Sequence, residues 1–182
     1  MNCRNKSFYN RLLLAVALIS GLLLPAGAQS PAAGDTHYHH ERYAAARRAY
    51  TQALATGDAA VRLHALTGLA RLELAESHPE AAAQWISEGE GMLTAVRDRQ
   101  TRCRFQLATG TFLAASSAFE DALDRYRQVY ERCGPATLPA AGALLHTAAA
   151  YEKMGSPDSS LHYAERAEGL FQQLLDSTDV RF

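Results

Sequence analysis

The feature that most constrains this chain is a pattern of small and aromatic residues that recurs along it in a constant order. Equivalent small residues, Ala46, Ala82, Ala122 and Ser160, lie 36, 40 and 38 residues apart. Small residues at such spacings let the two helices of an antiparallel hairpin approach closely, and an aromatic residue fills the gap between neighbouring hairpins. A repeat of this length predicts helical hairpins stacked side by side into a solenoid.

Four copies of the pattern align, and two of them depart from it. The last two copies are the clearest: Gly110, Leu113, Ser117, Ala122, Tyr126, Val129, and then Leu144, Ala148, Tyr151, Gly155, Ser160, Ala164, Ala167. The second copy has Glu73 where a large apolar residue is expected: Leu66, Leu69, Ala70, Ser77, Ala82, Ile86, Gly89. The first copy keeps only a second helix: Tyr43, Ala46, Tyr50, Ala53, Leu54.

Together these copies resemble the tetratricopeptide repeat (TPR) over residues 40–177. The resemblance implies an all-α, TPR-like α-solenoid of about seven antiparallel helices, three full repeats plus one half repeat. The period exceeds the roughly 34 residues usual for the family, so we expect longer helices. TPR proteins are non-catalytic binding and assembly modules, and the resemblance therefore implies a protein or peptide partner.

Apolar residues at helical spacing support this fold, and sustained alternation typical of strands is missing. Helices are predicted near 40–56, 59–76, 79–96, 99–115, 118–132, 138–154 and 157–176. Gly57 and Asp58 are expected to end one helix and cap the next. The pairs Ser77…Glu80 and Ser117…Glu120 have the pattern of capping boxes, in which a serine begins a helix.

The first 28 residues have the three parts of a secretory signal peptide. A basic start is followed by an apolar run over residues 12–24 and by small residues ending at Ala28. The run is shorter than the about 20 residues that span a bilayer. We expect cleavage after Ala28, a periplasmic or secreted protein, and no membrane span in the mature chain; a retained signal anchor is the alternative. Residues 29–39 are predicted to be a flexible leader and 178–182 a C-terminal tail.

Charge and motifs exclude several classes of function. The signal segment contains three of the 18 basic residues and none of the 19 acidic ones, so the mature chain has a net charge of −4. It lacks a basic stripe with interleaved aromatic residues, which argues against a nucleic-acid partner. It also lacks a nucleophile elbow, a glycine-rich phosphate loop and a zinc-protease motif. We therefore expect no enzyme, no catalytic residue and no cofactor.

Histidines gather in the predicted leader, where His37, His39, His40 and Glu41 lie within five residues. Imidazole and carboxylate groups are ligands for zinc and copper. No second cluster supplies further ligands at a defined distance. We therefore interpret these residues as a solvated segment and predict no metal site.

The mature chain has two cysteines, Cys103 and Cys133. In the repeat register, Cys103 begins the first helix of a hairpin and Cys133 ends the second, so both lie at the same end. An exported protein meets an oxidising environment. We predict a disulfide worth on the order of 3 kcal/mol, which closes a loop of about 30 residues; two free thiols are the alternative.

In TPR arrays the first helices of the hairpins line a concave groove. The predicted groove positions are His64, Thr67, Arg71, Arg104, Leu107, Thr111, Leu145, Glu152 and Lys153. Among them, Arg71, Arg104 and Lys153 form a modestly basic strip in an acidic protein. We predict that this strip binds an acidic peptide or a peptide C-terminus.

We expect the two ends of the predicted array to lack the polar capping helices that solenoids usually have. Leu170, Phe171, Leu174 and Leu175 lie on the last predicted helix. Either partner subunits cover these ends in a homo-oligomer, or Phe171 and its neighbours fold back onto the last hairpin. The predicted function is an exported, non-enzymatic TPR scaffold or adaptor. The alternative is a sensor-like or truncated regulatory TPR protein that acts with a separate membrane signalling partner.

Overall fold

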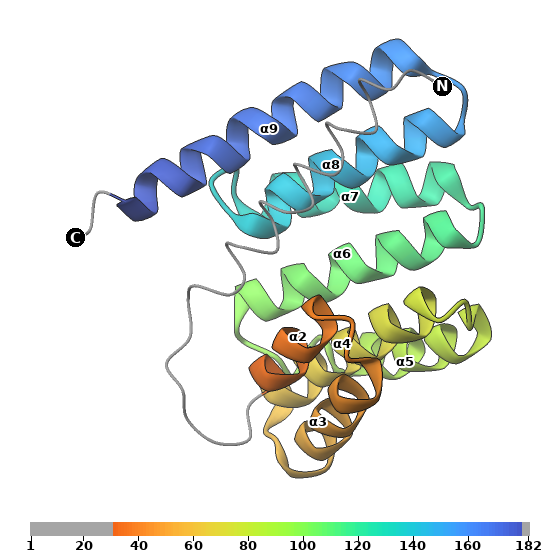
Figure 1. Cartoon of the computed structure of the whole chain (residues 1–182), viewed down its shortest axis with the longest axis vertical. Helices are drawn as coiled ribbons and strands as arrows, with labels where there is room; N and C mark the ends of the chain where they lie inside the picture. Colours follow the sequence, from red (N-terminus) through yellow and green to blue (C-terminus); the bar gives the residue numbers. More distant parts are fainter. Residues whose placement is uncertain (1–30, 180–182) are drawn as a thin grey trace.

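A computed structural model describes residues 31–179, so the expected signal peptide and residues 180–182 of the tail lie outside the described residues. The described part is all α-helical, and its hairpins stack into a solenoid (Figure 1). Its helices are α2 (Pro31–His39), α3 (Tyr43–Thr56), α4 (Ala59–Ala75), α5 (Pro79–Met92), α6 (Arg99–Ala115), α7 (Phe119–Cys133), α8 (Leu138–Lys153) and α9 (Pro157–Asp179). Among these helices, none combines the length and the apolar character that crossing a bilayer requires.

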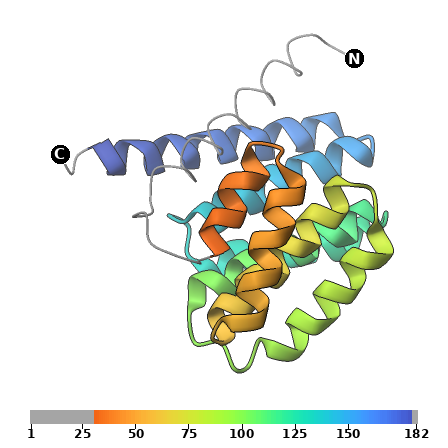
Figure 2. The same ribbon diagram turned by 60° about the horizontal axis from the view of Figure 1, so that its bottom comes forward.

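Consecutive helices pack as antiparallel hairpins: α2 with α3, α4 with α5, α6 with α7, and α8 with α9. The first helices of the hairpins also pack side by side, because α4 contacts both α2 and α6, and α6 contacts α8. Figure 2 shows the opening hairpin in front of the later ones. The predicted all-α solenoid is confirmed, and the first helices make up one of its faces.

The opening hairpin is complete, and the prediction of a flexible leader over residues 29–39 is wrong for its described part. Helix α2 is the first helix that the pattern had left out. Gly34 lies so close to the ring of Tyr50 that a Cβ atom on it would be 2.4 Å away, and Asp35 accepts a hydrogen bond from the Tyr50 hydroxyl at 2.7 Å. The sequence does not predict this helix, because proline, glycine and aspartate have low helix propensity. Packing against α3 stabilises the helix instead.

The turn inside each hairpin has the same backbone conformation. Left-handed φ angles of 56°, 63°, 64° and 76° occur at Glu41, Ser77, Ser117 and Gly155. After each of these residues, the next amide donates to the carbonyl five positions earlier: Arg42 to His37, His78 to Glu73, Ala118 to Leu113, and Ser156 to Tyr151. These bonds form a Schellman motif, which ends a helix.

Ser77 and Ser117 are therefore not the N-terminal caps that the capping-box pattern predicts. The capping positions are His78 and Ala118, and neither side chain makes a capping hydrogen bond. Each serine instead belongs to the end of the preceding helix. The prediction for Asp58 is confirmed, because its carboxylate accepts from two first-turn amides of α4.

We expect Ser117→Gly to stabilise the protein by about 0.5–1 kcal/mol. A left-handed backbone costs a residue with a Cβ atom about 1–2 kcal/mol, and glycine offsets part of the gain through its freedom in the unfolded chain. The matched control is Ser116→Gly, because Ser116 is also exposed but has a φ of −85°. Urea unfolding should show a gain for the first variant and a loss for the second; a loss in both would contradict the left-handed turn.

The second half of α9 packs its apolar residues against its own hairpin, whereas Leu161 in the first half is 55% exposed. Phe171 and Leu170 are 2% and 9% exposed and lie in one cluster with Leu144 and Leu145 of α8. Of the two ways to cover this end, folding back is therefore the one observed.

Candidate binding face

Asp35 of α2 joins the first three described helices through its carboxylate. It accepts from the Tyr50 hydroxyl at 2.7 Å and lies 2.8 Å from Nε2 of His64 on α4. Burial raises the pKa of Asp35, but the hydrogen bonds from His64 and Tyr50 and the charge of Arg71 outweigh it and hold the pKa below its ordinary value. The ionised carboxylate only accepts, so His64 carries its proton on Nε2.

Arg71 of α4 acts on this carboxylate through its charge, without an ion pair to it. Its guanidinium carbon is 4.5 Å from the centre of the Tyr38 ring on α2, which is a cation–π contact. Within residues 31–179, no carboxylate lies within ion-pair distance of Arg71. Burial and then the charge of Arg71 lower the pKa of His39 on α2 and of His146 on α8. Arg71 is thus a positive charge that acts on side chains of both the first and the last hairpin.

His146 of α8 is a neutral imidazole at physiological pH. Its ring stacks on Tyr126 of α7, with ring centroids 5.6 Å apart. Burial, with a smaller contribution from Arg71, lowers the pKa of His146 to about 4. It therefore offers a hydrogen-bond donor and an acceptor without adding a second charge near Arg71.

The three cations of the predicted basic strip do not form one cluster. Arg71 is half-buried beside Tyr38, whereas Arg104 and Lys153 are exposed. The height of each cation along its hairpin can be counted from the equivalent small residue of the second helix. Arg104 lies 18 residues before Ala122, Arg71 lies 11 before Ala82, and Lys153 lies 7 before Ser160. Helices α6 and α8 run in the same direction (Figure 1). A rise of about 1.5 Å per residue therefore separates Arg104 from Lys153 by about 16 Å along the axes.

The other predicted groove positions divide into buried and accessible residues. Thr67 and Leu145 are only 4% and 8% exposed, so they belong to the core rather than to a binding surface. The hydroxyl of Thr111 donates to a backbone carbonyl of its own helix. Asp35 and Tyr38 are not among the predicted groove positions, because the sequence of residues 29–39 predicts a leader rather than a helix. His146 was missed because nothing in its neighbours along the chain marks it.

The histidines of the predicted leader do not come together as a set of metal ligands among the described residues. The geometry instead brings together Glu73, Glu76 and His78, whose ligand atoms lie within 4.8 Å of one another. Arg47 of α3 already donates to both carboxylates. The positive charge of its guanidinium occupies the place that a cation would take, so we interpret this group as part of the contact between α3 and α4.

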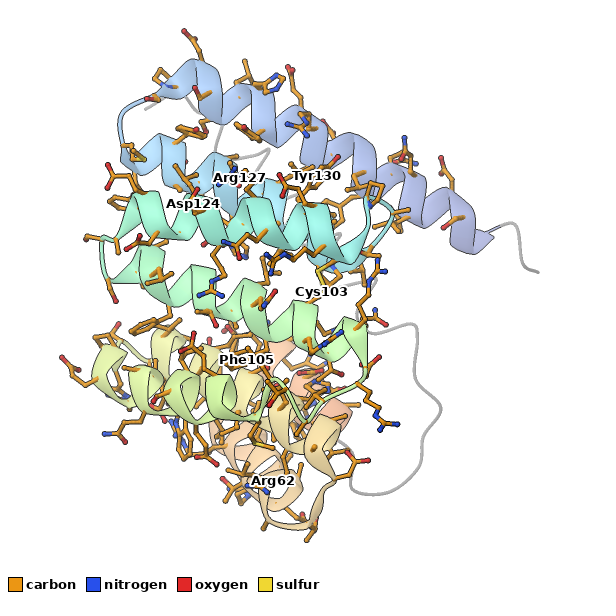
Figure 3. All side chains as sticks on the ribbon, turned by 180° about the vertical axis from the view of Figure 1, so that it is seen from behind. Arg62, Cys103, Phe105, Asp124, Arg127 and Tyr130 are labelled. Atoms are coloured by element: carbon orange, nitrogen blue, oxygen red, sulfur yellow. A yellow bond between two sulfur atoms is a disulfide. The ribbon has the colours of Figure 1, made fainter. Side chains whose placement is uncertain are left out.

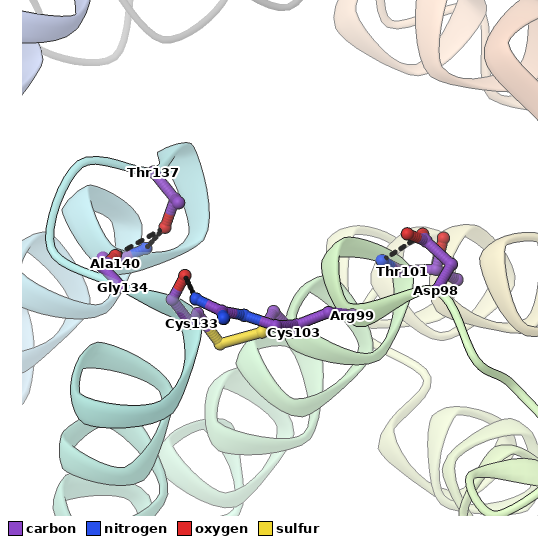
Figure 4. The surroundings of a disulfide bond; sticks show 8 residues. All are labelled: Asp98, Arg99, Thr101, Cys103, Cys133, Gly134, Thr137 and Ala140. Atoms are coloured by element: carbon purple, nitrogen blue, oxygen red, sulfur yellow. Dashed lines mark hydrogen bonds between the residues drawn. A yellow bond between two sulfur atoms is a disulfide. The ribbon is translucent and has the colours of Figure 1, made fainter.

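Cys103 and Cys133 are joined by a disulfide, with their Cα atoms 6.0 Å apart (Figure 4). The bond fastens α6 to α7 at the end of the hairpin opposite its turn. Arg99 adds a second link there, because its guanidinium donates to the Cys133 carbonyl at 2.6 Å. Gly134 follows with a φ of +89°, and a Cβ atom on it would lie 2.9 Å from that guanidinium.

Comparison with known proteins assigns the chain to no family: no protein-family model and no curated protein matches it. The function is therefore inferred from the solenoid and from the face formed by the first helices of its hairpins, α2, α4, α6 and α8. This first-helix face includes Tyr38, Arg71, Arg104, His146 and Lys153.

Proposed function

We propose that the protein is an exported, non-enzymatic TPR scaffold that binds an acidic peptide across the face of its first helices. The observation that carries the proposal is Arg71, a half-buried cation with an aromatic partner and no ion pair among the described residues. A partner carboxylate would give Arg71 a charge-assisted hydrogen bond, which is one of the stronger kinds.

The positions of the other two cations fit an extended ligand. Along the helix axes, Arg71 lies between Arg104 and Lys153, which are about 16 Å apart in this direction. An extended chain covers that distance with about five residues. We therefore propose a segment with acidic side chains near both of its ends and a carboxylate close to Arg71. Tyr38 and the neutral His146 would contact the segment between these charges.

Two further observations support the TPR assignment and the export. The repeated hairpins share the spacing of their small residues and the conformation of their turns. The disulfide between α6 and α7 favours an oxidising compartment, because cytosolic thiols are kept reduced.

Replacing all three cations by alanine tests the proposed face. Fluorescence anisotropy with a labelled seven-residue peptide that alternates glutamate and alanine should show at least a tenfold loss of affinity and a weaker dependence on salt. Single exposed charges contribute little, so the triple variant Arg71→Ala, Arg104→Ala, Lys153→Ala is the informative one.

The matched control removes three positive charges elsewhere: Arg48→Ala, Arg62→Ala, Arg127→Ala. All three arginines are exposed, and Arg127 pairs with Asp124 on the surface of α7 (Figure 3). This control variant should bind the peptide as the unmodified protein does. An equal loss in both triple variants would mean that the peptide responds to net charge alone and would contradict a specific face.

A further inference from the structure

A cavity of about 340 Å³ lies at the disulfide end of the α6/α7 hairpin. Its lining includes Leu93 from the connection after α5, Arg99, Arg102 and Cys103 from α6, and Arg132 near the end of α7. This volume falls within the range of about 300–1,000 Å³ typical of small-molecule sites. The cavity is distinct from the first-helix face, because Arg102 and Arg104 are two residues apart on a helix and point in nearly opposite directions.

Of the described residues, three arginines and no acidic residue line this cavity. The Arg99 guanidinium donates to the Cys133 carbonyl. Arg102 and Arg132 are exposed, and in the described part of the chain neither has an ion pair. Asp98, which precedes Arg99, accepts from the Thr101 amide at 2.8 Å and so caps α6 (Figure 4).

The register of the α6/α7 hairpin, which the disulfide fastens, brings two of these charges to the same end. Arg102 immediately precedes Cys103, and Arg132 immediately precedes Cys133, and these cysteines are paired across the two helices. Like charges held close to each other repel. An anion between them would relieve this repulsion and accept paired hydrogen bonds from the guanidinium groups.

We propose that this cavity binds an organic carboxylate with an apolar body. Leu93 and the disulfide form an apolar part of the wall, and the arginines recognise the carboxylate. An inorganic anion leaves the apolar wall uncovered, and a neutral alkyl compound leaves the arginines without a partner. The same chemistry occurs in a free alkyl acid and in the C-terminus of a peptide that ends in an apolar residue.

Titration of the full-length, ¹⁵N-labelled protein tests the site by NMR at constant ionic strength. Hexanoate should shift the amide signals of Thr94 and Gln106, which also line the cavity, in a saturable way. Sulfate and 1-hexanol should bind at least tenfold more weakly. A short peptide with a C-terminal leucine distinguishes the sources: tighter binding than hexanoate, lost on C-terminal amidation, indicates a peptide ligand, and weaker binding indicates a free acid.

The variant Arg102→Ala, Arg132→Ala should weaken hexanoate binding at least tenfold. The control Arg48→Ala, Arg127→Ala removes the same charge from exposed positions outside the cavity and should leave the affinity unchanged. The proposal is overturned if hexanoate produces no saturable shift in the unmodified protein, if sulfate binds as tightly, or if both double variants bind alike. None of these outcomes depends on whether the first-helix face binds a peptide.

Discussion

Reduction of the Cys103–Cys133 disulfide should lower the free energy of unfolding by about 3 kcal/mol. The bond joins residues 30 positions apart in sequence. Without it, the unfolded chain gains the entropy of an open loop, while the folded hairpin keeps its helices. Urea unfolding with and without a reductant measures the difference. The loss should be greatest at the free end of the α6/α7 hairpin, where amide exchange should accelerate.

The variant Cys103→Ala, Cys133→Ala is the matched control for the reductant. It should unfold with the stability of the reduced protein and should not respond to further reductant. Digestion without reduction should yield one linked peptide pair. Two thiols per mature chain, titrated in denaturant without reductant, would show that the bond does not form and would remove the reason for this stability difference.

The hairpins could be predicted from the sequence because close helix packing leaves a local trace. Ala46, Ala82 and Ala122 are fully buried, as the repeated small residues require. The pairing of Cys103 with Cys133 follows from the same register, because both ends of a hairpin are known once its helices are known. The position of Arg102 beside Arg132 could have been inferred in the same way, since each precedes a cysteine of that pair.

The first helix of the opening hairpin and the left-handed helix ends at Ser77 and Ser117 could not be predicted, because their determinants are tertiary or shared by two motifs. Helix α2 owes its stability to contacts with Tyr50, and its own residues favour a loop. A serine three positions before a glutamate fits both a capping box and a left-handed helix end, so the pattern alone does not separate them. The charge of Arg71 on α4 acts on His146 on α8, and such a relation depends on the packing of separate hairpins rather than on any one repeat.

Arg47→Ala should destabilise the protein by about 2–3 kcal/mol. The side chain of Glu73 is only 6% exposed, and Arg47 donates to it and to Glu76. The hydrogen bond from Arg47 outweighs burial and lowers the pKa of Glu73. Removing one partner of a buried pair costs about 3–5 kcal/mol, and the 38% exposure of Arg47 lets water replace part of the interaction. Arg48→Ala, which truncates the exposed neighbour, should cost far less.

The dependence on pH distinguishes this ion pair from a loss of packing. A carboxylate with a lowered pKa contributes stability above its unfolded value, near 4.3, and loses it as the pH falls through the folded value. The difference between the unmodified protein and Arg47→Ala should therefore be complete at pH 7 and shrink below about pH 4. A difference that stays constant down to pH 3 would mean that the arginine acts through its alkyl chain.

An apolar replacement of the whole pair tests why this repeat departs from the others. The equivalent positions to Glu73 are Leu113 and Tyr151, both partly buried, and the Tyr151 ring stacks on Tyr163 of its own hairpin. The double variant Arg47→Met, Glu73→Leu removes both charges together and should recover most of the stability lost in Arg47→Ala, because no buried carboxylate remains unpaired. If the double variant is as unstable as the single one, the repeat needs the charged pair for its geometry. Recovery would show that α3 and α4 need only a filled contact, and that the charge of Arg47 serves mainly to neutralise Glu73 and Glu76.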